Sequence, residues 1–325
     1  MQAFAYVHPE NLKEALASLA PAWGEIDVLA GGTDLLALLK DYIHTPKTVV
    51  SLKGVKELKG IKSSTAGLEI GAMTTVDELM SNAAVRAYPA LMQAAAGIAS
   101  PQIRNMGTVG GDLCQRPRCW YFRQGFGLLA QKDGKSLVEA GENRYHAIFG
   151  SGPACFVSAS SFAPALIALG AKVMIASAAG EREVAVADFF VAPTEESQRE
   201  NVLKPNEILT AIVVPSATGV KSATYEVRQK EALDWPLAAA AVALTMKGTS
   251  VAKASIVMGH VGPVPVVAES AAGMLAGKTI TAETAEAAGA EAVKSATPLS
   301  GNAYKVQLAK VAVKRALLTA AGIKV

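Results

Sequence analysis

Two short segments of the chain each place a pair of adjacent glycines beside threonine and aspartate. The first is Ala30-Gly31-Gly32-Thr33-Asp34 and the second is Thr108-Val109-Gly110-Gly111-Asp112. Adjacent glycines permit positive φ angles and let backbone N–H groups approach an anion with no Cβ between them. Together the segments predict a cradle for a phosphorylated cofactor, whereas either one alone is equally compatible with a plain tight turn.

Neither segment follows the familiar phosphate-binding patterns. No Gly-Lys-Ser or Gly-Lys-Thr directly follows either glycine pair, and neither has the G-x-G-x-x-G spacing. A P-loop and an ordinary dinucleotide-binding fold are therefore not indicated at these positions. The predicted cradle must be of another kind.

The residues around the first glycine pair predict elements that would hold it in place. Ile26–Ala30 is typical of a short strand, and Leu35–Lys40 continues as a mostly buried helix. After the second strand-like run, Thr48–Leu52, the pattern changes. Thr75-Val76-Asp77-Glu78 then has the form of a capping box, and a longer helix is predicted from Tyr88 to Ala99. That helix ends before Pro101 and leads into the second glycine pair.

The remaining chain predicts three regions with different compositions. We expect a small α/β unit at 1–57, a larger mixed unit at 58–179 with an inserted loop at 116–147, and a C-terminal unit at 180–325. Helices are predicted at Phe162–Leu169, Leu237–Met246 and within 282–321, and strands at Lys172–Ala176, Ile208–Val214, Ala223–Val227 and Ala254–Met258.

Composition limits the classes of function. The 325 residues are 51% hydrophobic and 18% charged, with a net charge of +3. Such a balance does not favour nucleic acid or a membrane surface as the partner. The N-terminus lacks the basic and apolar regions of a secretory signal, and no apolar run is long enough to span a membrane. We therefore expect a cytoplasmic protein, with export alongside a partner left open.

Cysteines and histidines show no metal-binding spacing. Cys114, Cys119 and Cys155 cannot all pair in disulfides, and the four histidines are scattered. Ordinary thiols are expected, and no Ser–His–Asp or Cys–His arrangement is indicated.

The glycine segments, with Ile103-Arg104-Asn105 just ahead of the second, resemble the FAD-binding medium subunit of the molybdenum hydroxylases. This family includes xanthine dehydrogenase, carbon monoxide dehydrogenase and aldehyde oxidoreductase. Further similar stretches are Phe189-Phe190, Lys204–Leu209, Tyr225–Arg228 and Gly259–Pro265. The resemblance implies an α+β fold. A two-part, PCMH-type FAD-binding region would combine a small α/β subdomain with a larger mixed one, followed by an antiparallel sheet packed on helices.

The resemblance also implies which residues would contact FAD. Gly31, Gly32 and Thr33 would donate to the pyrophosphate, flanked by Leu29 and Ala30. Thr108, Gly110 and Gly111 would close from the other side, and Asp112 would accept from a ribose or ribityl hydroxyl. Asp34 would cap the following helix or reach the cofactor indirectly, because a carboxylate repels phosphate.

Further positions carry open alternatives. Ala99 and Ser100 match positions near the cofactor, although Ser100 before Pro101 is also suited to a helix boundary. Arg104 would either order its loop or bond to phosphate. Arg228 and Lys230, with Asp234, would approach the isoalloxazine and stabilise its reduced form, or belong to a solvated basic strand.

The insert carries a second resemblance. Cys114–Phe122 is similar to a branch of the family whose FAD subunit holds an extra [4Fe-4S] cluster, with two more cysteines in the following loop. Leu128 and Ser136 stand where those cysteines are expected. We therefore expect no [4Fe-4S] cluster and no metal site in this chain.

As a whole, the resemblance implies an FAD-carrying oxidoreductase subunit of a heterotrimer. Its partners would be a small [2Fe-2S] subunit and a large molybdopterin subunit, with a dimer of heterotrimers as one arrangement. A single-chain flavin oxidase and a non-enzymatic assembly subunit are the alternatives. The substrate and the electron acceptor stay open, and the polar loop 194–201 is a candidate gate for the acceptor.

Overall fold

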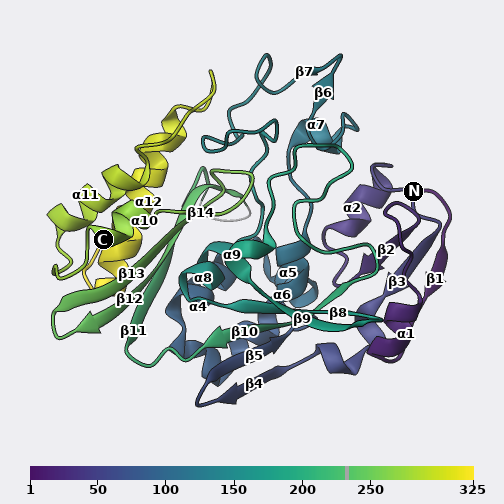
Figure 1. The fold of residues 1–325 in the computed structure, drawn as a ribbon, viewed down its shortest axis with the longest axis horizontal. Coiled ribbons are helices and arrows are strands. Elements are labelled where there is room, and N and C mark those ends of the chain that lie inside the picture. The colour runs from purple at the N-terminus through teal and green to yellow at the C-terminus, as the bar shows by residue number, and fades with distance from the viewer. Residues whose placement is uncertain (231–233) are drawn as a thin grey trace.

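The N-terminal unit contains three parallel strands with two helices. Its elements are β1 (Ala5–Val7), α1 (Leu12–Ala17), β2 (Ile26–Leu29), α2 (Leu35–Lys40) and β3 (Thr48–Ser51). Strand β3 lies in the middle of the sheet and pairs with both β1 and β2. The computed structural model describes residues 1–230 and 234–325, and this unit lies at the right of Figure 1. The predicted strand, glycine turn and helix are confirmed.

The second unit is a five-stranded antiparallel sheet covered by helices. The strands run in the order β4-β5-β10-β8-β9. The elements are β4 (Ile61–Ser64), β5 (Gly67–Gly71), α3 (Val76–Ser81), α4 (Pro89–Gly97), α5 (Pro101–Met106), α6 (Val109–Cys114), α8 (Phe162–Ala168), β8 (Lys172–Ser177), β9 (Gly180–Ala185), α9 (Val186–Phe189) and β10 (Ile208–Pro215). The capping box at Thr75 is present as predicted.

This sheet crosses the domain boundary that the sequence predicted at residue 180. Strand β9 begins at Gly180 and pairs with β8, while β10 pairs with both β5 and β8. Two of the five strands, β9 and β10, begin at or after residue 180. The five-stranded sheet therefore ends at Pro215, because its central strand β10 is the last of the five in sequence.

The C-terminal unit is an antiparallel sheet with helices on one face. Its strands lie in the order β11-β12-β13-β14. The elements are β11 (Val220–Arg228), β12 (Pro236–Lys247), β13 (Ser250–Gly259), β14 (Val266–Val267), α10 (Glu269–Gly273), α11 (Ala282–Ala292) and α12 (Tyr304–Ala321). In Figure 1 the yellow helices cover the left face of this green sheet. The predicted α+β architecture is confirmed.

The prediction of a helix at Leu237–Met246 is wrong, because these residues form most of β12. Ala241 and Ala243 lie in the core of the second unit, whereas Ala240 and Val242 lie in the core of the C-terminal unit. Burial on both faces removes the alternation that would mark a strand. Alanine favours helix intrinsically, but tertiary packing overrides that preference here.

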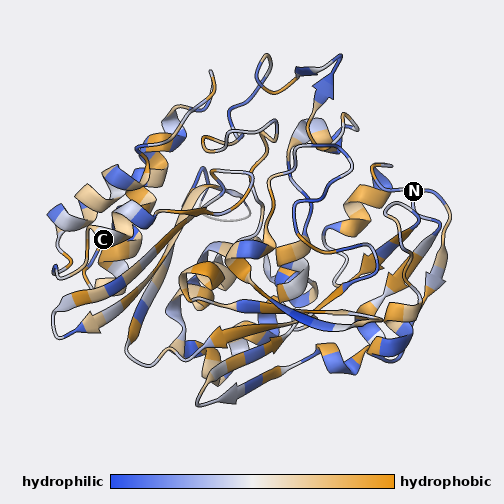
Figure 2. Cartoon of the chain, viewed as in Figure 1, coloured by the Kyte–Doolittle hydropathy of each residue, from blue (hydrophilic) through white to orange (hydrophobic). Residues whose placement is uncertain are grey.

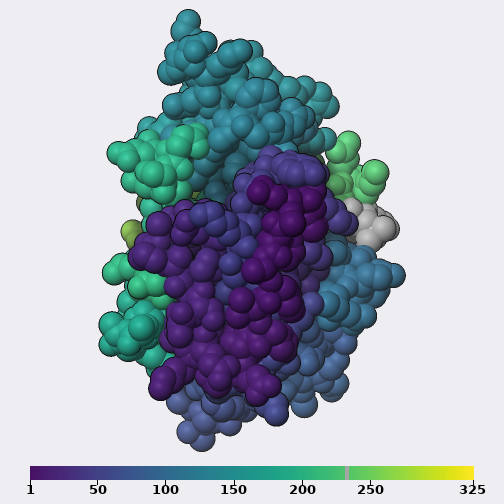
Figure 3. Space-filling model, turned by 90° about the vertical axis from the view of Figure 1, so that its right-hand side faces the viewer, coloured from purple at the N-terminus to yellow at the C-terminus, as the bar shows by residue number. Residues whose placement is uncertain are grey.

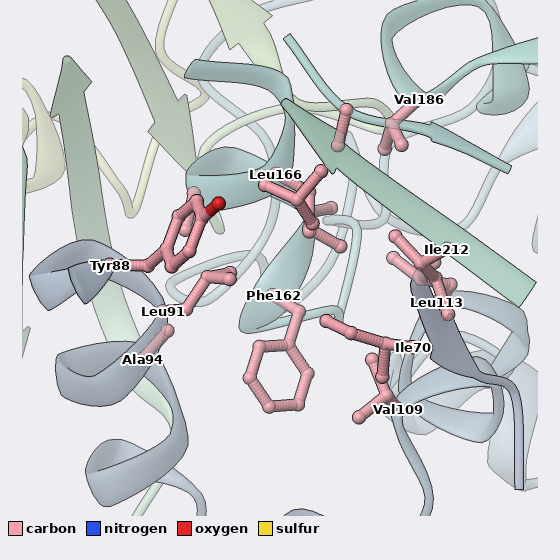
Figure 4. Packing of buried hydrophobic residues seen from close by; sticks show 14 of the residues in the cluster. Ile70, Tyr88, Leu91, Ala94, Val109, Leu113, Phe162, Leu166, Val186 and Ile212 are labelled. Atoms are coloured by element: carbon pink, nitrogen blue, oxygen red, sulfur yellow. The ribbon is translucent and has the colours of Figure 1, made fainter. Parts of the chain in front are cut away.

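The largest core joins helices α4 and α8 to the five-stranded sheet. Figure 4 shows Leu91 of α4, Phe162 and Leu166 of α8, and Ile70 and Ile212 of the sheet pointing toward one another. All five side chains are almost completely buried. This core holds the helix-rich side of the unit, which also carries the second glycine pair.

The insert at 116–147 projects from the rest of the molecule. It contains α7 (Trp120–Arg123) and a hairpin of β6 (Gln131–Lys132) and β7 (Lys135–Ser136). Figure 2 shows hydrophilic residues along the hairpin, and Figure 3 shows the insert in teal above the purple N-terminal unit. At its base, Phe122, Leu128 and Leu129 of the insert form an apolar cluster with Leu38 of α2 and with Phe156.

The end of the insert is attached to the C-terminal unit by α12. Lys305 is 1% exposed, and its Nζ donates to the carbonyls of Tyr145 (3.3 Å), His146 (3.0 Å) and His260 (2.8 Å). Asn302 donates to the carbonyls of His146 and Ala147.

Over the described ranges, we find no helix with the length and apolar character needed to cross a bilayer.

Candidate functional site

The two glycine segments lie in contact in the structure. A Cβ on Gly31 would meet the Met106 carbonyl oxygen at 1.8 Å, and a Cβ on Gly107 would lie 3.5 Å from the Thr33 hydroxyl oxygen. Gly32 has a φ angle of +86°, which favours glycine. The close approach of backbone to backbone explains why glycine occupies position 31.

A cavity of about 490 Å³ lies beside this contact. All three units and the insert contribute to its walls. Ten of the residues predicted to contact a cofactor line it: Ala30, Gly31, Gly32, Thr33, Asp34, Ala99, Thr108, Gly110, Gly111 and Asp112. Among the described residues, five predicted positions do not line it: Leu29, Ser100, Arg104, Arg228 and Lys230.

The first glycine turn presents unused hydrogen-bond donors. Within the described part of the chain, the backbone N–H groups of Gly31, Gly32 and Thr33 donate to no protein acceptor. Successive N–H groups in a glycine turn form a concave site for an anion. Since all three residues line the cavity, this turn can bind a phosphate group without a metal ion.

The second segment contributes differently from what the sequence suggested. The N–H of Gly110 donates to the Ala72 carbonyl (2.9 Å), and the N–H of Gly111 donates to the Thr108 hydroxyl oxygen (3.1 Å). Thr108 is the N-cap of α6. Both glycine amides are therefore occupied by the protein. Close packing against Ala72, whose Cβ would lie 2.7 Å from a Cβ on Gly110, explains the glycine there.

Asp34 anchors the insert. It stands at the N-cap position of α2 but forms no side-chain cap bond. Its carboxylate instead accepts from the backbone N–H of Arg116 (2.8 Å) and pairs with the guanidinium groups of Arg118 (2.9 Å) and Arg123 (2.8 Å). The predicted capping role is corrected, because three donors from the insert take the carboxylate.

Asp112 is likewise held by protein donors. Its carboxylate accepts from the Ser160 hydroxyl, from the backbone N–H of Phe162 (3.1 Å) and from the Gln115 side-chain amide (2.9 Å). Burial raises the pKa of Asp112 to about 6, although the bonds from Ser160 and Phe162 oppose that shift. These bonds join α6 to α8 and its preceding turn, and Asp112 also lines the cavity, so its predicted bond to a ribose or ribityl hydroxyl stays a prediction.

Arg116 connects three walls of the cavity, and the sequence did not single it out. Its Nε donates to Glu200 (2.6 Å), and its Nη1 contacts Nε2 of His44 (3.1 Å). A guanidinium can only donate, so His44 Nε2 accepts and Nδ1 carries the proton. That Nδ1–H faces Asp27 Oδ2 at 3.0 Å. This chain of contacts holds His44 between Asp27 and Arg116, which lie far apart in the sequence.

Two matching family models cover nearly the whole chain. The model described as the FAD binding domain in molybdopterin dehydrogenase matches residues 2–217, and that of the CO dehydrogenase flavoprotein C-terminal domain matches residues 223–320. The chain belongs to the molybdopterin dehydrogenase FAD-binding family. The chain therefore carries an FAD-binding domain, and the protein is an oxidoreductase subunit of this family.

Individual relatives agree over the full length. The carbon monoxide dehydrogenase medium chain of Hydrogenophaga pseudoflava is 30% identical, covering 97% of this chain and 96% of the relative. The FAD-binding subunit of aldehyde oxidoreductase from Escherichia coli is 31% identical, covering 95% and 96%. A structure of carbon monoxide dehydrogenase from H. pseudoflava has a TM-score of 0.77 at 29% identity, covering 98% and 97%.

Two polar positions predicted to lie near FAD have structural partners instead. Ser100 is the N-cap of α5, and its hydroxyl accepts from the Ile103 N–H (3.3 Å). Arg104 donates to the Ile98 carbonyl (3.0 Å) at the end of α4. These contacts favour the structural alternatives that the sequence left open for both residues.

The two predicted cations of the C-terminal unit do not line the cavity. Arg228 pairs with Glu226 and donates to the Gly97 carbonyl, so it is neither a solvated cation nor a residue of the cavity wall. Because Gly97 lines the cavity, Arg228 acts one layer behind it. Lys230 is exposed and precedes the residues that the structure does not describe.

Two tryptophans of the FAD subunit line the cavity without having been predicted. Trp23 carries the Arg199 guanidinium over its ring at 4.4 Å, and Trp235 carries that of Arg118 at 4.8 Å. The only hint of these positions in the sequence is that the chain has just three tryptophans. Which arginine meets which ring depends on the tertiary fold.

The cysteines of the insert are separated in the structure. Cys114 packs partly against the main core, whereas Cys119 packs with the base of the insert. Burial raises the pKa of Cys114 to about 12, with Asp112 and Glu200 adding to the shift. Across the described ranges, no three histidine, cysteine or acidic side chains are grouped to hold a metal ion.

Cys119 meets a histidine, although the sequence indicated no such pair. Its Sγ lies 3.1 Å from His146 Nε2. Burial and the nearby Lys305 lower the pKa of His146 to about 4, and burial raises the pKa of the Cys119 thiol. Both groups are therefore neutral at pH 7, so the pair lacks the thiolate needed for nucleophilic chemistry.

Proposed function

We propose that this chain is the FAD-carrying, electron-transfer subunit of a heterotrimeric molybdenum hydroxylase. It would receive electrons from a [2Fe-2S] partner and pass them to an external acceptor. Bound flavin supplies the chemistry, since it accepts electrons singly and releases them as a pair. The observation that carries the proposal is the cavity beside the free N–H groups of Gly31, Gly32 and Thr33.

The residues of the cavity would bind and orient the cofactor. The amides of the first glycine turn would hold the pyrophosphate, and the Thr108 hydroxyl proton is available to add one donor. Two of the carboxylates that line the cavity are already paired with cations: Asp34 with Arg118 and Arg123, and Glu200 with Arg116. Paired in this way, they oppose a nearby phosphate less than free carboxylates would.

We propose two partner subunits, a small one with [2Fe-2S] clusters and a large one with molybdopterin. Support comes from the names of the relatives, which are medium chains and FAD-binding subunits of dehydrogenases. A dimer of such heterotrimers and a cytoplasmic location are part of the proposal. The absence of a [4Fe-4S] cluster from this chain is also a proposal, and an iron assay on the purified subunit tests it.

We also propose a revised division of the chain. The first FAD subdomain would end near residue 57, as predicted, since η2 (Lys56–Leu58) separates β3 from β4. The second would extend to about residue 217 rather than 179, because β10 belongs to its sheet and the first family model ends there. The C-terminal unit would then start at β11.

Absorbance of the purified chain tests the function. We expect bound FAD that bleaches only when both partner subunits and their substrate are added. Bleaching of the isolated chain by a simple alcohol or sugar would instead indicate a single-chain oxidase. Failure to bind FAD at all would indicate an assembly subunit.

A further inference from the structure

Two of the three tryptophans are partly exposed inside the cavity. Trp23 is 39% exposed and Trp235 is 44% exposed, and both line its walls. Large aromatic side chains are usually buried, so exposed ones that line a cavity mark a surface that a ligand covers. Among the residues that the structure describes along the cavity wall, Trp120 of the insert does not occur.

Each of these two rings has one face covered by an arginine. The Arg199 guanidinium carbon lies 4.4 Å from the Trp23 ring centroid, and that of Arg118 lies 4.8 Å from the Trp235 centroid. A cation over a ring face stabilises the pair and restrains the plane of the ring. With 39% of Trp23 and 44% of Trp235 exposed, each indole keeps surface for another planar group.

The arginines are themselves held in position. Arg118 pairs with Asp34 (2.9 Å) and donates to the Gln115 side-chain oxygen (2.9 Å). Arg199 lies within the loop 194–201, whose Glu196 accepts from two backbone N–H groups of the insert at 2.6 and 2.8 Å. Arg118, which covers the Trp235 ring, is therefore held before a ligand enters, which lowers the entropy lost on binding.

The two stacks come from different parts of the molecule. Trp23 belongs to the N-terminal unit, whereas Trp235 lies directly before Pro236, the first residue of β12. The glycine turn with its free N–H groups lines the same cavity. FAD has the matching chemistry, because it carries two planar ring systems joined through a pyrophosphate.

We propose that the free faces of Trp23 and Trp235 stack on the two ring systems of bound FAD, one tryptophan on each. The inference rests on the proposed function, since it takes FAD as the ligand. Offset stacking of aromatic rings adds binding energy beyond the area buried. The two tryptophans together favour a dinucleotide over either half alone, because only FAD contacts both indole rings and the glycine turn at once.

Fragment binding tests this assignment. Calorimetry on the complete, FAD-free chain would compare ADP and FMN as probes for the two halves of FAD. We expect W23A to weaken one fragment about tenfold and W235A to weaken the other about tenfold, in line with the strength of one stacked pair. W120A, the matched control outside the cavity, should leave both fragments unchanged. W23F and W235F should restore part of the binding.

Two results would overturn the inference. One is that W23A or W235A binds both fragments as tightly as the unsubstituted chain does. The other is that both variants lose affinity for the same fragment. Should an alanine variant fail to fold, judged by its unfolding midpoint without ligand, the phenylalanine variant of that position gives the same comparison. Failure of the unsubstituted chain to bind FAD would reject the proposed function itself.

Discussion

Gly31 has no room for a side chain, because a Cβ would lie 1.8 Å from the Met106 carbonyl oxygen. We expect G31A to push the two glycine segments apart, to lose most FAD binding and to destabilise the fold by on the order of 3 kcal/mol. Flavin content and urea unfolding measure the two effects. G273A is the control, since nothing lies within 4 Å of that position. Full flavin content in G31A would contradict the role given to this contact.

Arg116 is the residue whose loss should disturb most of the cavity wall. R116A would leave Glu200, which is 7% exposed, as a buried carboxylate with no cation. Removing one partner of a buried pair costs about 3–5 kcal/mol. R144A in the same insert breaks an exposed pair with Glu142 and a contact with the exposed Tyr145 ring, and it should change stability little. Equal unfolding midpoints for the two variants would show that the Arg116 contacts contribute little.

The acidic residues show where reading from sequence stops. The expectation that Asp34 does not face a phosphate came from charge repulsion, and it stays a prediction. The partners of Asp34 are three arginines far along the chain. Those of Asp112 are Gln115 nearby in the sequence, together with Ser160 and Phe162. Such pairings follow from the fold and leave no periodic signal in the sequence.

At the level of elements, local patterns predicted those that have one buried face. The helix α3 with its capping box and the strands β2, β3 and β8 were found where periodicity placed them. Strand β12 was missed because both faces of its central part are buried, so a nearly continuous run of alanine, valine and leucine replaces the alternation of a half-buried strand. The pairing of β10 with β5 and β8 was not predicted, because β10 returns to the sheet after a long stretch of chain.

The attachment of the insert to α12 predicts a dependence on pH. Burial lowers the pKa of Lys305 to about 7, below the ordinary value of 10.5. Between pH 7 and 10.5 the amine of Lys305 is more protonated in the unfolded chain than in the folded one. The free energy of unfolding therefore rises with pH over this range. We expect the free energy of unfolding of the unsubstituted protein, relative to K305M, to increase by about 1.4 kcal/mol per pH unit within that window.

Denaturant unfolding at several values between pH 7 and 10 measures this slope. The exposed Lys294, paired only with Glu291 on the surface, provides the matched variant K294M, which should show no such trend. A flat difference between the unsubstituted protein and K305M would mean that the buried amine titrates normally.

Across the whole molecule, the cavity unites the N-terminal unit, the second unit, the insert and the start of β12. A ligand bound there should stabilise all of them together. At a free FAD concentration 100 times the dissociation constant, we expect about 2.7 kcal/mol of added stability and one cooperative transition in calorimetry.

Riboflavin provides the comparison for this whole-molecule effect. It has the isoalloxazine ring but no phosphate, so it cannot use the free N–H groups of Gly31, Gly32 and Thr33. We expect a much smaller shift of the unfolding midpoint than with FAD at equal concentration. Equal shifts would show that the glycine turn does not contribute to binding.

Strand β12 has a consequence for attempts to cut the protein into parts. Its residues Ala241 and Ala243 complete the core around α4 and α8, while Ala240 and Val242 complete the core under α12. A fragment ending at residue 217 would expose the apolar side of those two helices to water. The two family models therefore meet at a point that does not separate two independently folding domains. We expect either half to aggregate when it is produced alone.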